Sequence, residues 1–223
     1  MWYRNLKSML FRTISSLIVA GLVFAGAAVA FTASSPQAAQ ANDITPPPPL
    51  PPGLAPVPAG QKLFLVGHAV GTQNYVCRPS GAGVAYILFT PEATLFGGDG
   101  GQVITHYFSP NPFEPNTDPK VVADGMIRAT WQHRDTSTVW AKLHQPNGAV
   151  TVDPNAIAWL LLDVVGARNG PTGGDKLTET TFIQRLNTTG GLAPSTGCSS
   201  LTDVGNRAFV PYTADYFFYK MVK

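Results

Sequence analysis

Short runs of β-branched and aromatic residues, separated by glycine-rich turns, recur along the chain. The runs are 62–68, 72–77, 84–89, 102–108, 126–132, 138–143, 179–186 and 210–219. Such runs have the length and composition of strands, and glycine pairs such as Gly190-Gly191 are typical of the turns between them. The pattern predicts an all-β domain over residues 61–223, folded as an antiparallel β-sandwich or a barrel-like structure with long loops.

Two segments interrupt this pattern. In residues 153–165, Asp153 and Pro154 suit the start of a helix, but the apolar run that follows them is continuous. We therefore expect a single helical turn that leads into a buried strand. Residues 109–125 contain several prolines among scattered polar residues, so a long surface loop is predicted there.

The first 41 residues have the pattern of a signal peptide. Residues 1–12 carry Arg4, Lys7 and Arg12 without an acidic residue, and residues 14–30 are apolar or small. Two small-x-small sites could end this segment, Ala28-Val29-Ala30 and Ala39-Gln40-Ala41. We predict cleavage after Ala41, at the second site, and hence a secreted or cell-envelope protein. The alternative is an uncleaved anchor, because an apolar run of about 17 residues is just long enough to span a bilayer. Only in that case do we expect contact with a membrane.

The apparent basicity of the chain belongs to this N-terminal segment. Three of the 15 Lys and Arg residues lie in it, which leaves 12 basic and 13 acidic residues in the remainder. A net charge near −1 lacks the basic surface that nucleic acids or anionic membranes attract. We therefore expect no nucleic-acid partner.

A proline-rich segment follows. Residues 45–58 contain eight prolines in fourteen positions. Proline fixes φ and has no amide donor, so residues 42–60 are predicted to be a disordered linker, extended as a polyproline spacer.

The chain has two cysteines, Cys77 and Cys198. An even number of cysteines in an exported chain normally forms disulfides, and two cysteines allow one intramolecular bond. A reactive or metal-binding thiol is the alternative, but the sequence contains no CxxC motif. We expect a Cys77–Cys198 disulfide, with the Gly190-Gly191 turn bringing Cys198 toward Cys77.

The sequence lacks the familiar motifs of catalysis and cofactor binding. It contains no HExxH zinc motif, no GxSxG nucleophile elbow and no phosphate-binding Walker loop. No cofactor and no metal site are predicted. The histidines His68, His106, His133 and His144 are not spaced as obvious ligand pairs on a helix.

Several segments resemble the exported family called domain of unknown function 3455. They are VGTQNYVC (70–77), THY (105–107), IAWLLLDV (157–164), FIQRLNTTGGLAP (182–194) with Cys198, and VPYTADYFFY (210–219). The resemblance implies a β-rich exported domain and no established activity. Members commonly have a Gly-Pro-Thr-Trp step and an Asp-Gly-Ser turn after their His-Tyr pair. Here loop 109–125 intervenes and the turn reads Asp135-Thr136-Ser137, so a site near His106 would have a different rim.

A ligand site is predicted where aromatic and polar side chains of several strands converge. Aromatic side chains offer a ligand large rigid contacts, and a few polar groups fix its orientation. The candidates are His106, Tyr107, Trp131, Asp135, Arg185 and Tyr212. Strand alternation places Ile183 and Arg185 on one face of residues 179–186, so Arg185 needs a carboxylate or several carbonyl oxygens as partners. A purely structural role for the aromatics and for Arg185 is the competing interpretation.

These observations favour a non-catalytic exported module that binds a small molecule, a glycan or a cell-envelope component, or that has a structural role. One alternative is a hydrolase with an unfamiliar site built from His106, Asp135 and Glu92. Another is a metal-binding protein that uses scattered histidines. The sequence leaves open whether the protein is an enzyme. Asn187-Thr188-Thr189 would be a glycosylation site only in a eukaryotic cell.

Overall fold

The computed structural model describes residues 44–118 and 125–223, so the predicted signal peptide, residues 1–41, lies outside the described residues. The described chain is all-β, as predicted, apart from a 3-10 turn at Leu201–Asp203. Its strands are β1 (Gln61–Ser80), β2 (Gly83–Phe96), β3 (Gln102–Asn111), β4 (Met126–His133), β5 (Thr138–Leu143), β6 (Ala149–Val150), β7 (Trp159–Arg168), β8 (Thr180–Gly190) and β9 (Arg207–Met221).

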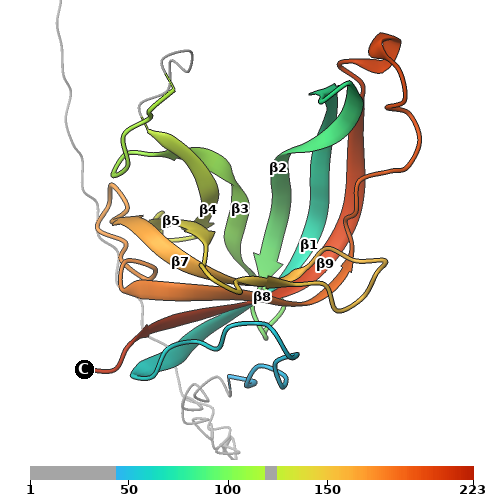
Figure 1. Cartoon of the computed structure of the whole chain (residues 1–223). Helices are drawn as coiled ribbons and strands as arrows, with labels where there is room; N and C mark the ends of the chain where they lie inside the picture. Colours follow the sequence, from blue (N-terminus) through green and yellow to red (C-terminus); the bar gives the residue numbers. More distant parts are fainter. Residues whose placement is uncertain (1–43, 119–124) are drawn as a thin grey trace, which may run out of the picture. The chain divides into compact units, whose positions relative to one another are not determined.

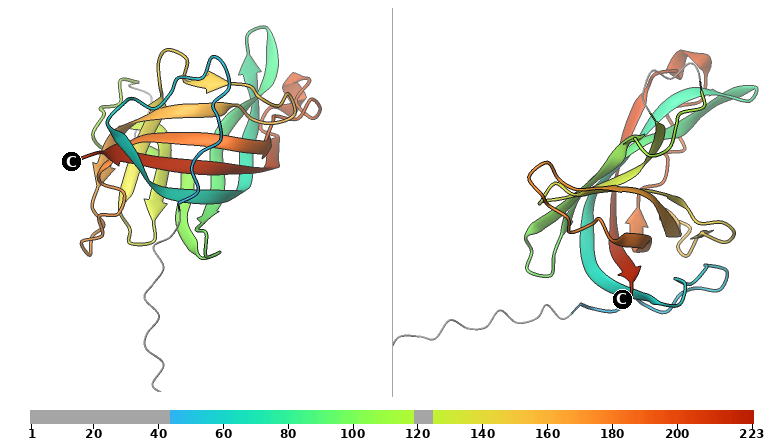
Figure 2. Two further views of the ribbon diagram at one scale, coloured as in Figure 1. Left: turned by 90° about the horizontal axis from the view of Figure 1, so that it is seen from below. Right: turned by 90° about the vertical axis from the view of Figure 1, so that its left-hand side faces the viewer.

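Eight of these strands close into an antiparallel barrel (Figures 1 and 2). The sheet runs β5-β4-β3-β2-β1-β9-β8-β7, and pairing of β5 with β7 from Thr138↔Arg168 to Leu143↔Leu162 completes the circle. The short β6 pairs with β7 beside this circle. Of the two predicted architectures, the chain therefore adopts the barrel.

Strand β1 contains both of the runs 62–68 and 72–77, which are continuous through Gly71. This glycine lies within the strand, and a Cβ atom there would overlap with the carbonyl oxygen of Glu92 on β2. Gly71 is thus used for close approach of two strands and does not form a turn. The expected helical turn before β7 is also absent, because Asp153 and Ala156 form only a hydrogen-bonded turn before the strand.

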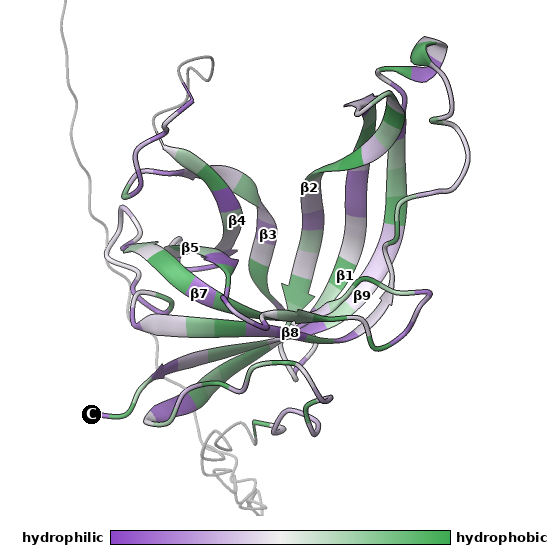
Figure 3. Ribbon diagram, in the orientation of Figure 1, coloured by the Kyte–Doolittle hydropathy of each residue, from purple (hydrophilic) through white to green (hydrophobic). Residues whose placement is uncertain are grey.

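Hydrophobic and hydrophilic residues follow one another along the strands (Figure 3), and strand geometry places successive side chains on the inside and the outside of the barrel in turn. The inner cluster fills one end of the barrel with Leu95, Ile104, Val139 and Leu177, each at most 1% exposed. Leu177 comes from the loop between β7 and β8, and it closes this end of the barrel. Burying aliphatic side chains of this size contributes roughly 1.5–3 kcal/mol each to the free energy of unfolding.

A second apolar cluster lies on the outer surface. Leu161, Leu186, Phe217 and Tyr219 project outward and are covered by the chain that precedes β1, in which Leu54 is only 6% exposed. The backbone amide of Ala55 also donates to the carbonyl of Asn147. Residues 50–57 were expected to be a free spacer, but they pack on the barrel because leucine, alanine and valine alternate with the prolines. The predicted domain boundary at residue 61 stays a prediction.

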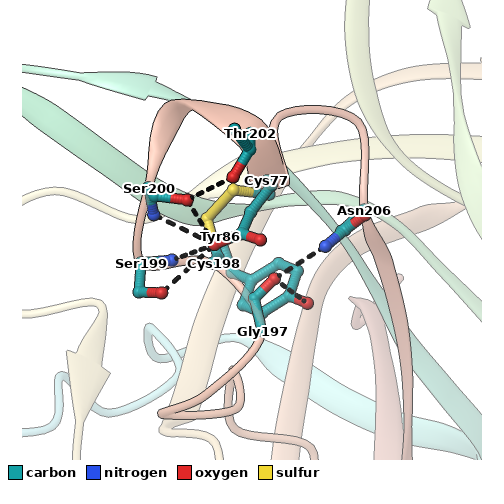
Figure 4. The surroundings of a disulfide bond; sticks show 9 residues. Cys77, Tyr86, Gly197, Cys198, Ser199, Ser200, Thr202 and Asn206 are labelled. Atoms are coloured by element: carbon teal, nitrogen blue, oxygen red, sulfur yellow. Dashed lines mark hydrogen bonds between the residues drawn. A yellow bond between two sulfur atoms is a disulfide. The ribbon is translucent and has the colours of Figure 1, made fainter.

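The ends of three strands continue beyond the barrel as a three-stranded extension. It consists of residues 75–90 of β1 and β2 and residues 207–211 of β9. The predicted disulfide between Cys77 and Cys198 is present and ties the loop before β9 to this extension (Figure 4). Gly190 and Gly191 both have positive φ, as expected for the turn that leads toward Cys198.

Candidate functional site

A cavity of about 360 Å³ lies inside the barrel, toward the end that bears the extension. Its wall is mostly apolar and includes Leu88, Phe108, Ile127, Ala141, Leu160 and Leu162. At its mouth, Leu88, Ile127 and Leu143 are more than one-third exposed, whereas the opposite end of the barrel is filled. The volume lies within the range of about 300–1,000 Å³ that is common for small-molecule sites.

His106 projects into this cavity from β3. Its ring stacks on Trp131 of β4 with centroids 4.2 Å apart and an interplanar angle of 10°, and it meets the edge of Tyr216 of β9. The Nδ1 atom lies 2.8 Å from the carbonyl oxygen of Thr130. Because that oxygen can only accept, Nδ1 carries the proton and Nε2 of the neutral ring is a hydrogen-bond acceptor.

Burial keeps the His106 ring neutral. It lowers the pKa of His106 from 6.5 to about 3, although the bond to Thr130 opposes this effect, and the nearby Arg185 lowers the pKa further. A general base works best with a pKa near the working pH. His106 is therefore suited to accept a hydrogen bond from a ligand and poorly suited to remove a proton from one.

Arg185 lies on the inner face of β8 with Ile183, as strand alternation predicted. Its Nε and Nη2 atoms donate to the carbonyl oxygen of Ala158 at 3.2 and 2.9 Å. We expected a carboxylate or several carbonyls, but within residues 44–118 and 125–223 Arg185 has no ion pair. The guanidinium has further N–H donors and contacts the Tyr216 hydroxyl. It places an uncompensated positive charge at the cavity.

Of the other candidates, Tyr212 lies on the inner face but behind the cavity wall. It is 2% exposed, and its hydroxyl oxygen lies 3.4 Å from that of Tyr216. Burial raises its pKa well above the ordinary value, and the neighbouring Tyr216 adds to this effect. Tyr107 lies on the opposite face of β3 from His106 and so points away from the cavity.

Asp135 has a different position and a structural role. It lies in the turn between β4 and β5, where it accepts hydrogen bonds from the backbone and hydroxyl of Ser137 and from the amide of Lys176. Burial would raise the pKa of Asp135, but these bonds outweigh it and hold the pKa well below the ordinary value. The bonds fix the loop that inserts Leu177 into the closed end of the barrel.

The residues considered for a hydrolase and for a metal centre are dispersed. Glu92 is exposed on the outer face of β2, and neither it nor Asp135 lines the cavity that contains His106. In the part of the chain that the structure describes, no group of three or more His, Cys, Asp or Glu residues could hold a metal ion.

Sequence reasoning did not single out Gln73 or Phe108, which also line the cavity. Gln73 follows Ala69 and Gly71 at alternate positions of β1, and it is 2% exposed. A polar side chain at an inward position of a strand was the signal that could have identified it.

Comparison with known proteins gives a family and no closer relative. Neither curated proteins nor solved structures yield a match. Within the described residues, no helix has the length and hydropathy that crossing a bilayer requires. A family model described as "Protein of unknown function (DUF3455)" matches residues 58–220, which include the whole barrel except its last residue. The chain therefore belongs to this family, as its segments had suggested.

Proposed function

We propose that this protein is an extracytoplasmic binding protein that holds a small, largely apolar molecule inside its barrel. The observation that carries the proposal is the cavity of about 360 Å³, which has an apolar wall, one filled end and an exposed mouth. Burial of an apolar ligand in such a site is favourable by roughly 25 cal/mol per Å² of apolar surface, before the costs of association.

Export is part of the proposal. Its support is the basic and apolar pattern of residues 1–41 and the Cys77–Cys198 disulfide, since disulfides persist in oxidising compartments. A binding role is favoured over catalysis because the described lining of the cavity contains no carboxylate and its histidine, His106, has a pKa of about 3. The other polar lining residues are Gln73, Arg128, Lys142, Arg185 and Tyr216. This set can orient a ligand but offers no efficient base.

Binding of a neutral apolar fluorophore such as N-phenylnaphthylamine tests the proposal. We expect saturable binding at one site per chain. Ala129→Phe, which adds a ring to the cavity wall, should weaken binding at least about tenfold, a change of about 1.4 kcal/mol. The matched control is Val70→Phe, which should leave the affinity unchanged because Val70 is 58% exposed and does not line the cavity.

Two results would contradict an interior site. One is the absence of saturable binding by the wild-type protein to apolar probes. The other is equal affinity of Ala129→Phe and Val70→Phe for the probe, because the probe would then bind on the outer surface.

A further inference from the structure

Two side chains of the cavity wall carry hydrogen-bond donors that are buried within the protein. Trp131 is 1% exposed and Gln73 is 2% exposed, and both line the cavity. Among the described residues, the indole Nε1 of Trp131 and the amide Nε2 of Gln73 have no hydrogen-bond partner. Gln73 lies beside the Tyr212 hydroxyl, but no bond of ordinary geometry forms from its Nε2. Both nitrogen atoms are shielded from the cavity by the surrounding side chains, so the donor group that a ligand meets there is the Arg185 guanidinium.

The charged side chains that line the cavity are all positive within the described residues. Arg185 uses two N–H groups on the Ala158 carbonyl, and no acidic side chain belongs to the described lining of the cavity. The other lining cations are Arg128 and Lys142, and Arg128 is paired with Glu114 at 2.7 and 3.0 Å. A ligand that brings a negative group to Arg185 would therefore meet attraction without competition from a carboxylate of the protein.

The charge and geometry of the Arg185 guanidinium favour some anions over others. A guanidinium presents its N–H groups as a planar fork that matches the two oxygens of a carboxylate. The neutral His106 adds no second charge beside it. Among the described lining residues, Arg128 is paired with Glu114 and Lys142 is exposed beside Leu143 at the mouth, so Arg185 is the charge at the inner end. One positive charge suits a monoanion, whereas a phosphate dianion is usually held by more than one cation.

We propose that the bound molecule is an amphiphile with a carboxylate head group, a fatty-acid-like chain whose head is held by Arg185. The tail would lie along the apolar wall, past Phe108 and Leu160, toward the exposed Leu88 and Ile127 at the mouth. This inference rests on the proposed interior binding site and assigns its ligand class.

The test compares ligands that share one tail and differ only in the head. Decanoate, decanol and decylamine are titrated by calorimetry into the purified protein. We expect decanoate to bind at least about tenfold more tightly than decanol and decylamine to bind most weakly. Equal affinity for all three would overturn the carboxylate assignment and leave the interior site intact. Binding of none of them, together with no binding of the neutral fluorophore, would overturn the proposed function itself.

A variant assigns the preference to Arg185. Arg185→Gln should bind decanol as the wild type does but lose the preference for decanoate over decanol. The control variant Arg134→Gln should keep this preference, because Arg134 is exposed in the turn at the closed end of the barrel. A preference that survives Arg185→Gln would contradict the assignment. If Arg185→Gln does not fold, the pKa of the decanoate carboxyl group is measured instead, from the carbon-13 signal of carboxyl-labelled decanoate bound to the wild type. The pKa of this carboxyl group should fall on binding, because Arg185 favours the carboxylate form. An unchanged or raised pKa would contradict the proposal.

Discussion

Two polar residues of the barrel interior, His106 and Arg185, differ in charge. His106 and Arg185 lie on neighbouring parts of the cavity, yet one is neutral and the other charged. Burial explains the neutral imidazole, since a charged ring would lose hydration without gaining an anionic partner. The Arg185 guanidinium donates two hydrogen bonds to the Ala158 carbonyl, and these bonds help to stabilise its charge.

The buried neutral His106 should make the stability of the protein depend on pH. Its pKa is about 3 in the folded protein and 6.5 as the ordinary value. Between these values the unfolded chain binds more protons, so the free energy of unfolding falls as pH falls. A single such group lowers the free energy of unfolding by about 2 kcal/mol between pH 7 and pH 5. Urea unfolding at the two pH values measures this difference.

The control for this measurement is another histidine. His106→Gln should remove most of the difference between pH 7 and pH 5, whereas His68→Gln should retain it, because His68 is exposed on the outside of β1. An equally large difference in His106→Gln would show that other groups cause the pH dependence.

At the scale of secondary-structure elements, the most informative one is the segment before β1. Its prolines prevent it from joining the sheet, yet its apolar residues cover the outer cluster of Leu161, Leu186, Phe217 and Tyr219. Tyr219 contributes a buried hydrogen bond of 2.6 Å to Gln184 beneath this cover. Burial raises the pKa of Tyr219 to about 12.

If this segment is part of the folded domain, Leu54→Ala should destabilise the whole protein. Truncation of a buried leucine costs about 2–5 kcal/mol in the free energy of unfolding, whereas the exposed Pro56→Ala should change it by less than about 1 kcal/mol. Urea unfolding of both variants checks this prediction. Identical stability of Leu54→Ala and the wild type would support the free spacer that proline content alone suggested.

For the whole molecule, closure of the barrel and the disulfide connect distant parts of the chain. The bond joins residues 121 positions apart and links the extension to the loop before β9. Closing a loop of this length stabilises the folded state by roughly 4–5 kcal/mol on the chain-entropy estimate. The variant Cys77→Ala/Cys198→Ala should therefore have a lower Tm in a thermal scan. An unchanged Tm would show that the loop before β9 opens without affecting the barrel.

Much of the fold followed from local sequence, because glycine punctuation and strand alternation are local properties. Alternation placed Ile183 and Arg185 inside the barrel correctly, and cysteine number gave the disulfide. Barrel closure through β5 and β7 was not predictable, since both a sandwich and a barrel satisfy the same pattern. Asp135 was misplaced because its distance from the cavity depends on how the turn after β4 folds back to bind Lys176.

The central claim is that the interior of the barrel holds a carboxylate amphiphile, and a crystal structure with decanoate brominated at its tail tests it most directly. We predict a carboxylate oxygen within hydrogen-bond distance of Arg185 and the bromine near the mouth, beside Leu88 or Ile127. Bromine density on the outer wall or on the extension, with no ligand density inside the barrel, would contradict the account.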